Sequence, residues 1–124
     1  MCKLLNFLIA LLISLICFSC KTKITAKFEI INTTNEKIDS FYILPTNLKN
    51  NFIQLEPNSK SLYNFDMTEL PKNDGSYGLS FKTKTKNVFI GFGYYTNGYP
   101  MESLTKIFIN SDTVIVKPEY KNKY

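Results

Sequence analysis

The sequence predicts an all-β domain, folded as a single antiparallel β-sandwich of about seven or eight strands. Apolar and polar residues alternate in short runs after residue 23, which is the period of a strand with one buried face. Clusters of Asn, Gly, Pro and Ser separate these runs, and they are typical of turns. No helical period of useful length occurs after the amino-terminal segment. A small β-barrel is the alternative, because it shows the same regular spacing of short strands.

The first half of the domain is expected to supply four strands. Tyr63, Phe65 and Met67 share one side of the fourth strand, which marks that side as the buried one. A turn cluster at residues 32–35 separates the first two strands, so we expect these strands to pair with each other. The four strands are expected at residues 24–30, 37–44, 52–55 and 60–66.

The second half is expected to supply four more strands. Asn97-Gly98 is the dipeptide that favours a type I′ hairpin turn, in which both central residues need positive φ. We therefore expect residues 104–109 to return antiparallel to residues 88–95. Lys82, Lys84 and Lys86 alternate with threonines, a pattern that protects an exposed strand edge from other chains. The remaining strands are expected at residues 76–81 and 113–117.

One short motif bears on the type of sandwich. Leu70, a turn and then Tyr77 at the start of an alternating strand resemble the tyrosine corner of immunoglobulin-like and fibronectin-like sandwiches. This resemblance implies an immunoglobulin-like fold, in which the Tyr77 hydroxyl bonds to backbone a few residues upstream. The alternative interpretation is that Tyr77 is one more aromatic residue of the core.

The amino-terminal segment has the pattern of a secretory signal peptide. Lys3 precedes an apolar run from Leu4 to Phe18, and small Ser19 comes just before a break to polar residues. Cys17-Phe18-Ser19-Cys20 resembles the lipobox of bacterial, Bacteroidota-type lipoproteins, although Cys17 and Phe18 stand where leucine and a smaller residue are usual. The resemblance implies cleavage before Cys20 and acylation of Cys20. An uncleaved membrane helix and an ordinary secreted protein are the alternatives.

These features divide the chain into four parts. We expect a signal peptide at 1–19, a lipidated tether at 20–23, the β-sandwich at 24–118 and a polar tail at 119–124. About 100 residues suffice for one domain and not for two. Lys21 stands where enteric-type lipoproteins carry the aspartate of inner-membrane retention, and residues 21–23 differ from the acidic clusters of surface export. The resemblance therefore implies the outer membrane, on its periplasmic face.

Composition restricts the chemistry of the domain. The chain contains no His, Arg or Trp, and its cysteines are Cys2, Cys17 and Cys20. A Ser-His-Asp arrangement cannot be built, and a zinc site without Cys or His would be unusual. The net charge of +5 comes from lysine. Bidentate contacts from the arginine guanidinium are the commonest way to read bases, so a chain without arginine is a poor candidate for binding nucleic acid. We expect no enzyme, cofactor, metal or nucleic-acid partner. A small enzyme using two carboxylates is the weakest alternative, with Asp66, Glu69, Asp74 and Glu102 in or near loops.

The residues around the Asn-Gly turn are the best candidates for a binding site. Tyr and Asn on a hairpin combine rigid amphipathic area with adaptable hydrogen bonds. The candidates are Tyr94, Tyr95, Asn97 and Tyr99, and alternation requires one of Tyr94 and Tyr95 to face the core. The glycines at 91 and 93 allow close approach of a ligand, or they mark a bulge. The sequence thus favours a lipid-anchored module that binds a protein or glycan, with a structural subunit of an envelope assembly as the alternative.

Overall fold

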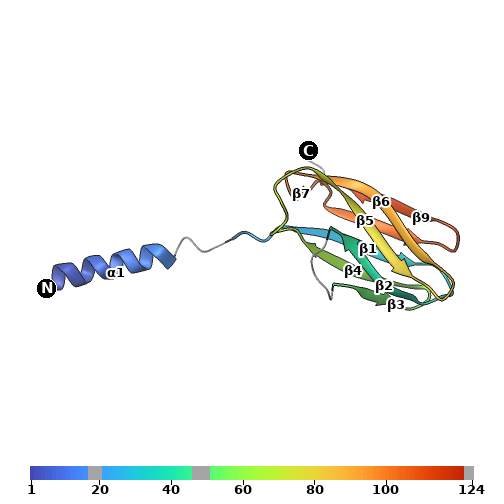
Figure 1. The fold of residues 1–124 in the computed structure, drawn as a ribbon, viewed down its shortest axis with the longest axis horizontal. Helices are drawn as coiled ribbons and strands as arrows, with labels where there is room; N and C mark the ends of the chain where they lie inside the picture. The colour runs from blue at the N-terminus through green and yellow to red at the C-terminus, as the bar shows by residue number, and fades with distance from the viewer. Residues whose placement is uncertain (17–20, 46–50, 122–124) are drawn as a thin grey trace.

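The structure is a computed structural model that describes residues 1–16, 21–45 and 51–121 (Figure 1). The acylation candidate Cys20 and the rest of the lipobox-like segment lie outside the described residues. The described chain forms one helix and nine strands: α1 (Cys2–Ile16), β1 (Thr25–Asn32), β2 (Ile38–Leu44), β3 (Ile53–Leu55), β4 (Ser59–Asp66), β5 (Gly75–Lys82), β6 (Asn87–Thr96), β7 (Tyr99–Pro100), β8 (Leu104–Ile109) and β9 (Val114–Glu119).

The amino-terminal helix is present and stands apart from the strands. Figure 1 shows α1 projecting away from the domain, and its described side chains are exposed. Within the described residues, no helix has both the length and the apolar character needed to span a membrane.

The strands form two sheets that pack face to face, so the predicted all-β sandwich is confirmed (Figure 1). One sheet has the order β4-β1-β8-β9, and the other has the order β3-β2-β5-β6-β7. One pair departs from the expected antiparallel arrangement, because β1 and β8 run parallel. A parallel pair needs a long connection and not a hairpin. Here the chain between β1 and β8 passes through the other sheet, because β7, which precedes β8, belongs to the five-stranded sheet.

Two expected strand pairs are wrong. β2 lies in the five-stranded sheet and pairs with β3 and β5, whereas β1 pairs with β4 and β8. The strand that returns beside β6 is the two-residue β7, and β8 lies in the other sheet. Alternation shows which side of a strand faces the core, but both sheets offer the same kind of inward face. The sequence pattern therefore could not tell which layer each strand joins.

Aromatic side chains fill the core between the layers. Phe28 lies edge-on to Tyr77 with ring centroids 5.3 Å apart, and Phe41 makes a similar contact with Tyr63 at 5.9 Å. The Tyr77 hydroxyl donates to Met67 Sδ at 3.6 Å and not to backbone, so the expected tyrosine corner is wrong and Tyr77 is a core aromatic. Burial raises the pKa of Tyr77 well above its ordinary value, with a further contribution from the Glu102 carboxylate.

Candidate functional site

The predicted hairpin turn has the expected backbone conformation. Asn97 and Gly98 form a two-residue loop between β6 and β7, and both have positive φ, 51° and 73°. The Asn97 backbone N–H donates to Asp74 Oδ1 at 2.9 Å, and the Gly98 N–H donates to the Asn73 carbonyl at 3.0 Å. The turn is thus fastened to the connection between β4 and β5.

A bulge decides which of the two adjacent tyrosines is exposed. Gly93 has a φ of +50°, and the pairing of β6 with β5 shifts register between Tyr77 and Gly75. The extra residue reverses the alternation, so Tyr95 faces the core with 7% of its surface exposed, and Tyr94 is 55% exposed. Tyr95 is therefore too buried to contact a partner, and its prediction as a binding residue is wrong.

The other candidate residues do not form one site. Tyr94 lines a cleft of about 280 Å³ together with Glu102 and Tyr120. Tyr99 is 52% exposed but does not line that cleft, and the Lys72 ammonium lies 5.4 Å from the centre of its ring. The side-chain placement thus divides the predicted aromatic surface into two parts.

This aromatic surface lies at the end of the sandwich where the chain enters it. Thr25, the first residue of β1, lines one hollow together with Pro100 and Met101. Figure 1 shows β7 at the same end as the segment that leads from α1 into β1. We call this end, with residues 24–25, 67–75 and 94–103, the proximal end.

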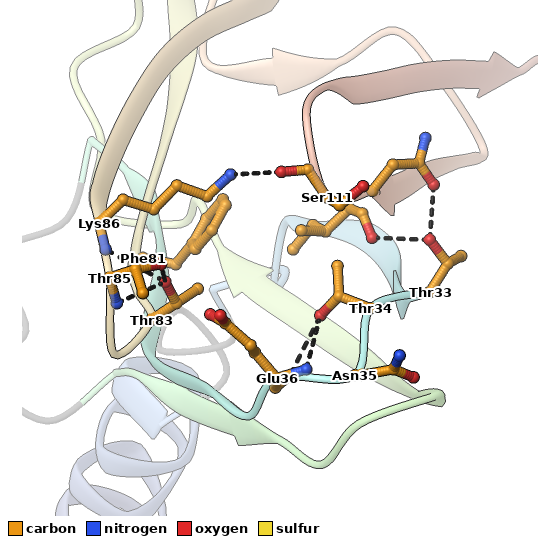
Figure 2. Close-up of a pocket in the computed structure, with 11 residues that line it drawn as sticks. Thr33, Thr34, Asn35, Glu36, Phe81, Thr83, Thr85, Lys86 and Ser111 are labelled. Atoms are coloured by element: carbon orange, nitrogen blue, oxygen red, sulfur yellow. Dashed lines mark hydrogen bonds between the residues drawn. The ribbon is translucent and has the colours of Figure 1, made fainter.

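The opposite, distal end carries a pocket that the sequence did not indicate. Three connections surround it: the loop between β1 and β2, the β5–β6 hairpin and the β8–β9 hairpin (Figure 2). The pocket has a volume of about 430 Å³, and the side chains of Phe81 and Ile109 close its base. Its rim is polar and consists of Thr33, Thr34, Asn35, Glu36, Thr83, Thr85, Lys86, Asn110 and Ser111.

Hydrogen bonds between the connections hold the rim together. The Lys86 ammonium reaches across to the Ser111 carbonyl at 2.8 Å, and the Thr33 hydroxyl contacts Asn110 Oδ1 at 2.6 Å (Figure 2). The Thr83 N–H donates to the Lys86 carbonyl at 2.9 Å and closes the β5–β6 turn. The lysine-rich stretch 82–86 is therefore a hairpin turn, and its interpretation as a protected strand edge is wrong. The Lys-Thr alternation continued through the turn and hid it.

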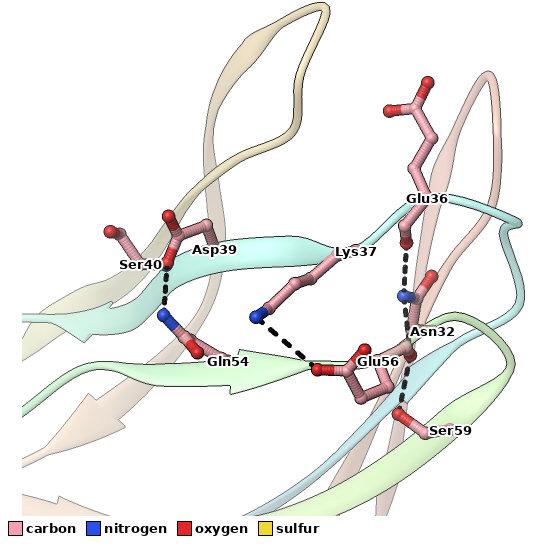
Figure 3. Close-up of polar contacts among 8 residues, drawn as sticks. All are labelled: Asn32, Glu36, Lys37, Asp39, Ser40, Gln54, Glu56 and Ser59. Carbon is pink, nitrogen blue, oxygen red and sulfur yellow. Dashed lines mark hydrogen bonds and ion pairs between the residues drawn. The ribbon is translucent and has the colours of Figure 1, made fainter.

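A buried asparagine supports the β1–β2 loop from below. Asn32 is 1% exposed, and its Nδ2 donates to the carbonyls of Glu36 and Glu56 at 2.9 and 3.0 Å (Figure 3). Its Oδ1 accepts from the N–H and the hydroxyl of Thr34 at 3.0 and 2.7 Å. Both N–H donors of this amide and both acceptor sites of its oxygen are used, so Asn32 ties the β1–β2 loop to the β3–β4 turn.

The pocket offers both signs of charge to a ligand. Within the described chain, the Glu36 carboxylate has no ion-pair or hydrogen-bond partner, and Figure 2 shows it extending toward the β5–β6 hairpin. The Lys86 ammonium uses one donor on Ser111 and keeps others for a ligand. The site can therefore accept and donate hydrogen bonds at the same time.

The carboxylates considered for catalysis act mainly in turns. Asp66 Oδ1 accepts from the Thr68 N–H at 3.0 Å, and Asp74 holds Asn97. Hydrogen bonding from Thr68 lowers the pKa of Asp66, which suits an acceptor and not a proton donor. Glu69 pairs with Lys21 at 3.5 Å. Among the described residues, no group of three or more His, Cys, Asp or Glu is placed to hold a metal ion.

Comparisons with models of protein families, with curated proteins and with solved structures find no match to this chain.

Proposed function

We propose that this protein is a lipid-anchored envelope protein whose β-sandwich binds a glycan without catalysis. Cys20 would carry the anchor in the outer membrane, with the domain on the periplasmic face. The observation that carries the proposal is the distal pocket, which lies at the opposite end of the sandwich from the start of β1. An anchor at residue 20 leaves this pocket directed away from the lipid and open to a ligand.

Several properties of the pocket favour a glycan over a flat protein contact. A volume of about 430 Å³ is within the range of small-ligand sites, roughly 300 to 1,000 Å³. Hydroxyl, amide, carboxylate and ammonium groups surround it, and these pair with the hydroxyls of a sugar. The energy of protein contacts is concentrated in large anchors such as Trp, Tyr and Arg, and the one aromatic residue of this pocket, Phe81, is buried.

The anchor and the ligand can be tested separately. Mass spectrometry of the membrane fraction is expected to find Cys20 acylated at the mature amino terminus, which would be a durable anchor because several acyl chains bind stably. A Cys20→Ala chain that is still processed and still partitions into detergent would contradict the anchor. Protease treatment of intact cells tests the placement, since efficient cleavage from outside would put the domain on the surface.

The binding test uses the full chain on an array of envelope glycans. We expect Glu36→Gln and Lys86→Met each to weaken binding by about 1 to 2 kcal/mol, roughly five- to thirtyfold, because each removes a charged hydrogen bond. Glu69→Gln is the matched control, because it removes an exposed carboxylate at the proximal end and leaves the pocket intact. Equal binding by all three variants would refute the distal pocket as the site.

A second candidate site is the proximal aromatic surface. Tyr94 and Tyr99 are both more than half exposed, and rigid tyrosines suit a protein contact. A tether of only residues 21–23 spans about 10 Å, so the anchor would keep this surface close to the lipid. Capture of a protein partner that is lost on Tyr99→Ala, with glycan binding unchanged, would favour this second site.

A further inference from the structure

The cleft beside Tyr94 is lined by aromatic rings from both sheets. It lies between β6 of one sheet and β8 and β9 of the other, and its volume is about 280 Å³. Tyr77 and Phe92 stack with ring centroids 5.6 Å apart, and Tyr77 is 2% exposed. Tyr94 and Tyr120 are both more than half exposed. This aromatic cleft therefore has buried rings at its base and exposed rings at its mouth.

A carboxylate accompanies these rings. Glu102 is partly buried in the aromatic cleft, close enough to Tyr77 to raise the pKa of that phenol. The four ion pairs of the described chain do not include Glu102. Thr105, which is 4% exposed, adds a hydroxyl to the lining. Aromatic rings attract cations, and a carboxylate and a hydroxyl accept hydrogen bonds, so the aromatic cleft suits an ammonium group.

A second hollow next to the aromatic cleft carries the opposite charge. Glu102 and Tyr120 line both, and they form a shared wall. The second hollow also contains Lys27 and Lys121, which are exposed and take part in no ion pair of the described chain. We call it the lysine hollow. Lysine ammonium groups bind phosphate through charge-assisted hydrogen bonds.

We propose that the aromatic cleft and the lysine hollow together bind the headgroup of phosphatidylethanolamine. Its ammonium occupies the aromatic cleft, and its phosphate lies at Lys27 and Lys121. A two-carbon chain separates the two charges of this headgroup, so they can reach adjacent hollows. A primary ammonium suits the cleft better than a quaternary one, because its N–H groups can donate to Glu102 and Thr105.

The position of the two hollows favours a membrane lipid over a free phosphoamine. Thr25, the first residue of β1, lines the lysine hollow. Residues 21–24 span at most about 14 Å from the proposed anchor at Cys20, which keeps the hollow near the lipid. This step rests on the proposed anchor, whereas the binding chemistry does not. Neither hollow shares a residue with the distal pocket, so the glycan site is separate.

Native mass spectrometry of the full chain in dodecyl maltoside micelles tests the headgroup. It measures the dissociation constants of phosphatidylethanolamine and of phosphatidylglycerol, which keeps the phosphate and lacks the ammonium. We expect phosphatidylethanolamine to bind about tenfold more tightly, as for one charge-assisted hydrogen bond. Excess water-soluble glycerophosphoethanolamine should displace it. Equal affinities for the two lipids, or no displacement by the soluble headgroup, would refute the proposal.

Substitutions test the two charges separately. Glu102→Gln should weaken phosphatidylethanolamine about fivefold or more and leave phosphatidylglycerol unchanged, because only the ammonium loses a partner. Glu69→Gln is the matched control, since Glu69 is an exposed proximal carboxylate that lines neither hollow. Lys27→Met should weaken both lipids about threefold or more, and Lys72→Met, outside both hollows, should weaken neither. The same loss from a variant and its control would refute the site.

The aromatic ring at the shared wall provides a further test. Tyr120→Ala should weaken phosphatidylethanolamine about threefold or more, because it removes a ring that attracts the ammonium. Tyr99→Ala removes a similarly exposed tyrosine that lines neither hollow, and it should have no effect on either lipid. Unchanged binding by Tyr120→Ala would refute the aromatic cleft as the ammonium site. These assays do not depend on acylation of Cys20 or on glycan binding, so failure of the headgroup site and failure of the proposed function can be told apart.

Discussion

The two ends of the sandwich are held together in different ways. At the distal end, side chains from three connections bond to one another and to backbone, with buried Asn32 at the centre. At the proximal end, a two-residue turn with positive φ docks on the β4–β5 connection through its backbone N–H groups. The distal end thus depends on side-chain hydrogen bonds, whereas the proximal end depends on backbone conformation.

This difference explains why sequence alone revealed one end and not the other. A turn such as Asn97-Gly98 is encoded in adjacent residues, so it can be recognised locally. The distal pocket combines Thr33, Lys86 and Ser111, which lie far apart in the chain and belong to residue types common on any surface. Its existence depends on which strands are neighbours.

The largest expected effect tests the distal network. Asn32→Ala should lower the free energy of unfolding by about 3 kcal/mol, because it removes the four hydrogen bonds of a buried amide, which join the β1–β2 loop to the β3–β4 turn, and leaves the Thr34 N–H without its partner. Asn64→Ala, at an exposed position of β4, should change it by less than about 0.5 kcal/mol. Urea unfolding of a chain beginning at Lys21 measures both, and we expect this chain to fold without exposed α1. Equal values for the two variants would contradict the role of Asn32.

The next effect tests the proximal turn. Gly98→Ala should cost about 2 kcal/mol, because alanine is strained at positive φ and its Cβ would lie 3.2 Å from the Pro71 carbonyl oxygen. Gly91→Ala, where the nearest atom is 4.0 Å away, is the control and should cost less than about 0.5 kcal/mol. Thermal unfolding distinguishes them, and a tolerated Gly98→Ala would show that the turn does not hold the proximal end.

A smaller effect should appear in alkaline solution. The raised pKa of Tyr77 means that the fold favours the neutral phenol, so this stabilisation is complete below pH 10 and is lost as pH rises above it. At pH 11 the loss is about 1.4 kcal/mol, from ionisation of Tyr77 in the unfolded chain. Tyr77→Phe should remove this part of the pH dependence, and Tyr99→Phe should keep it. The free energy of unfolding, measured between pH 8 and 11, tests the difference. If the unsubstituted chain and both variants lose the same free energy over this range, Tyr77 is not the source of the loss.

The smallest effect concerns the exposed aromatic surface. Tyr99→Ala should change the free energy of unfolding by no more than about 0.5 kcal/mol, since half of the side chain is already in water. Tyr95→Ala should cost about 3 kcal/mol, because it leaves a cavity beside Tyr77. Comparable melting temperatures for these two variants would mean that the bulge at Gly93 is misplaced.

The positions of most strands could be predicted from the sequence, because a strand with one buried face imposes the alternation directly. Tyr63, Phe65 and Met67 are buried as expected, and the Asn97-Gly98 turn has the expected backbone. The sandwich followed from the regular spacing of these strands. Of the candidate contact residues, Tyr94 and Tyr99 proved exposed.

The parts that could not be predicted depend on more than local pattern. The single inserted residue at Gly93 exchanges the faces of Tyr94 and Tyr95, and alternation cannot locate such an insertion. The parallel pairing of β1 with β8 joins segments separated by most of the domain, so nothing near either strand records it. The turn at residues 82–86 could not be recognised either. It carries no glycine or proline, and its Lys-Thr alternation resembles that of a strand.

The pairing of β1 with β8 also determines the order in which strands can pair during synthesis. Synthesis produces β1 first, and β4 follows early enough to pair with one of its edges. The other edge of β1 waits until all of β2 to β7 has been made, because its partner is the last strand but one. Long-range pairing of this kind is slow, and an open edge invites pairing with other chains. The emerging chain therefore passes through a period in which β1 is half paired, and completion of the fold depends on the last strands to be made.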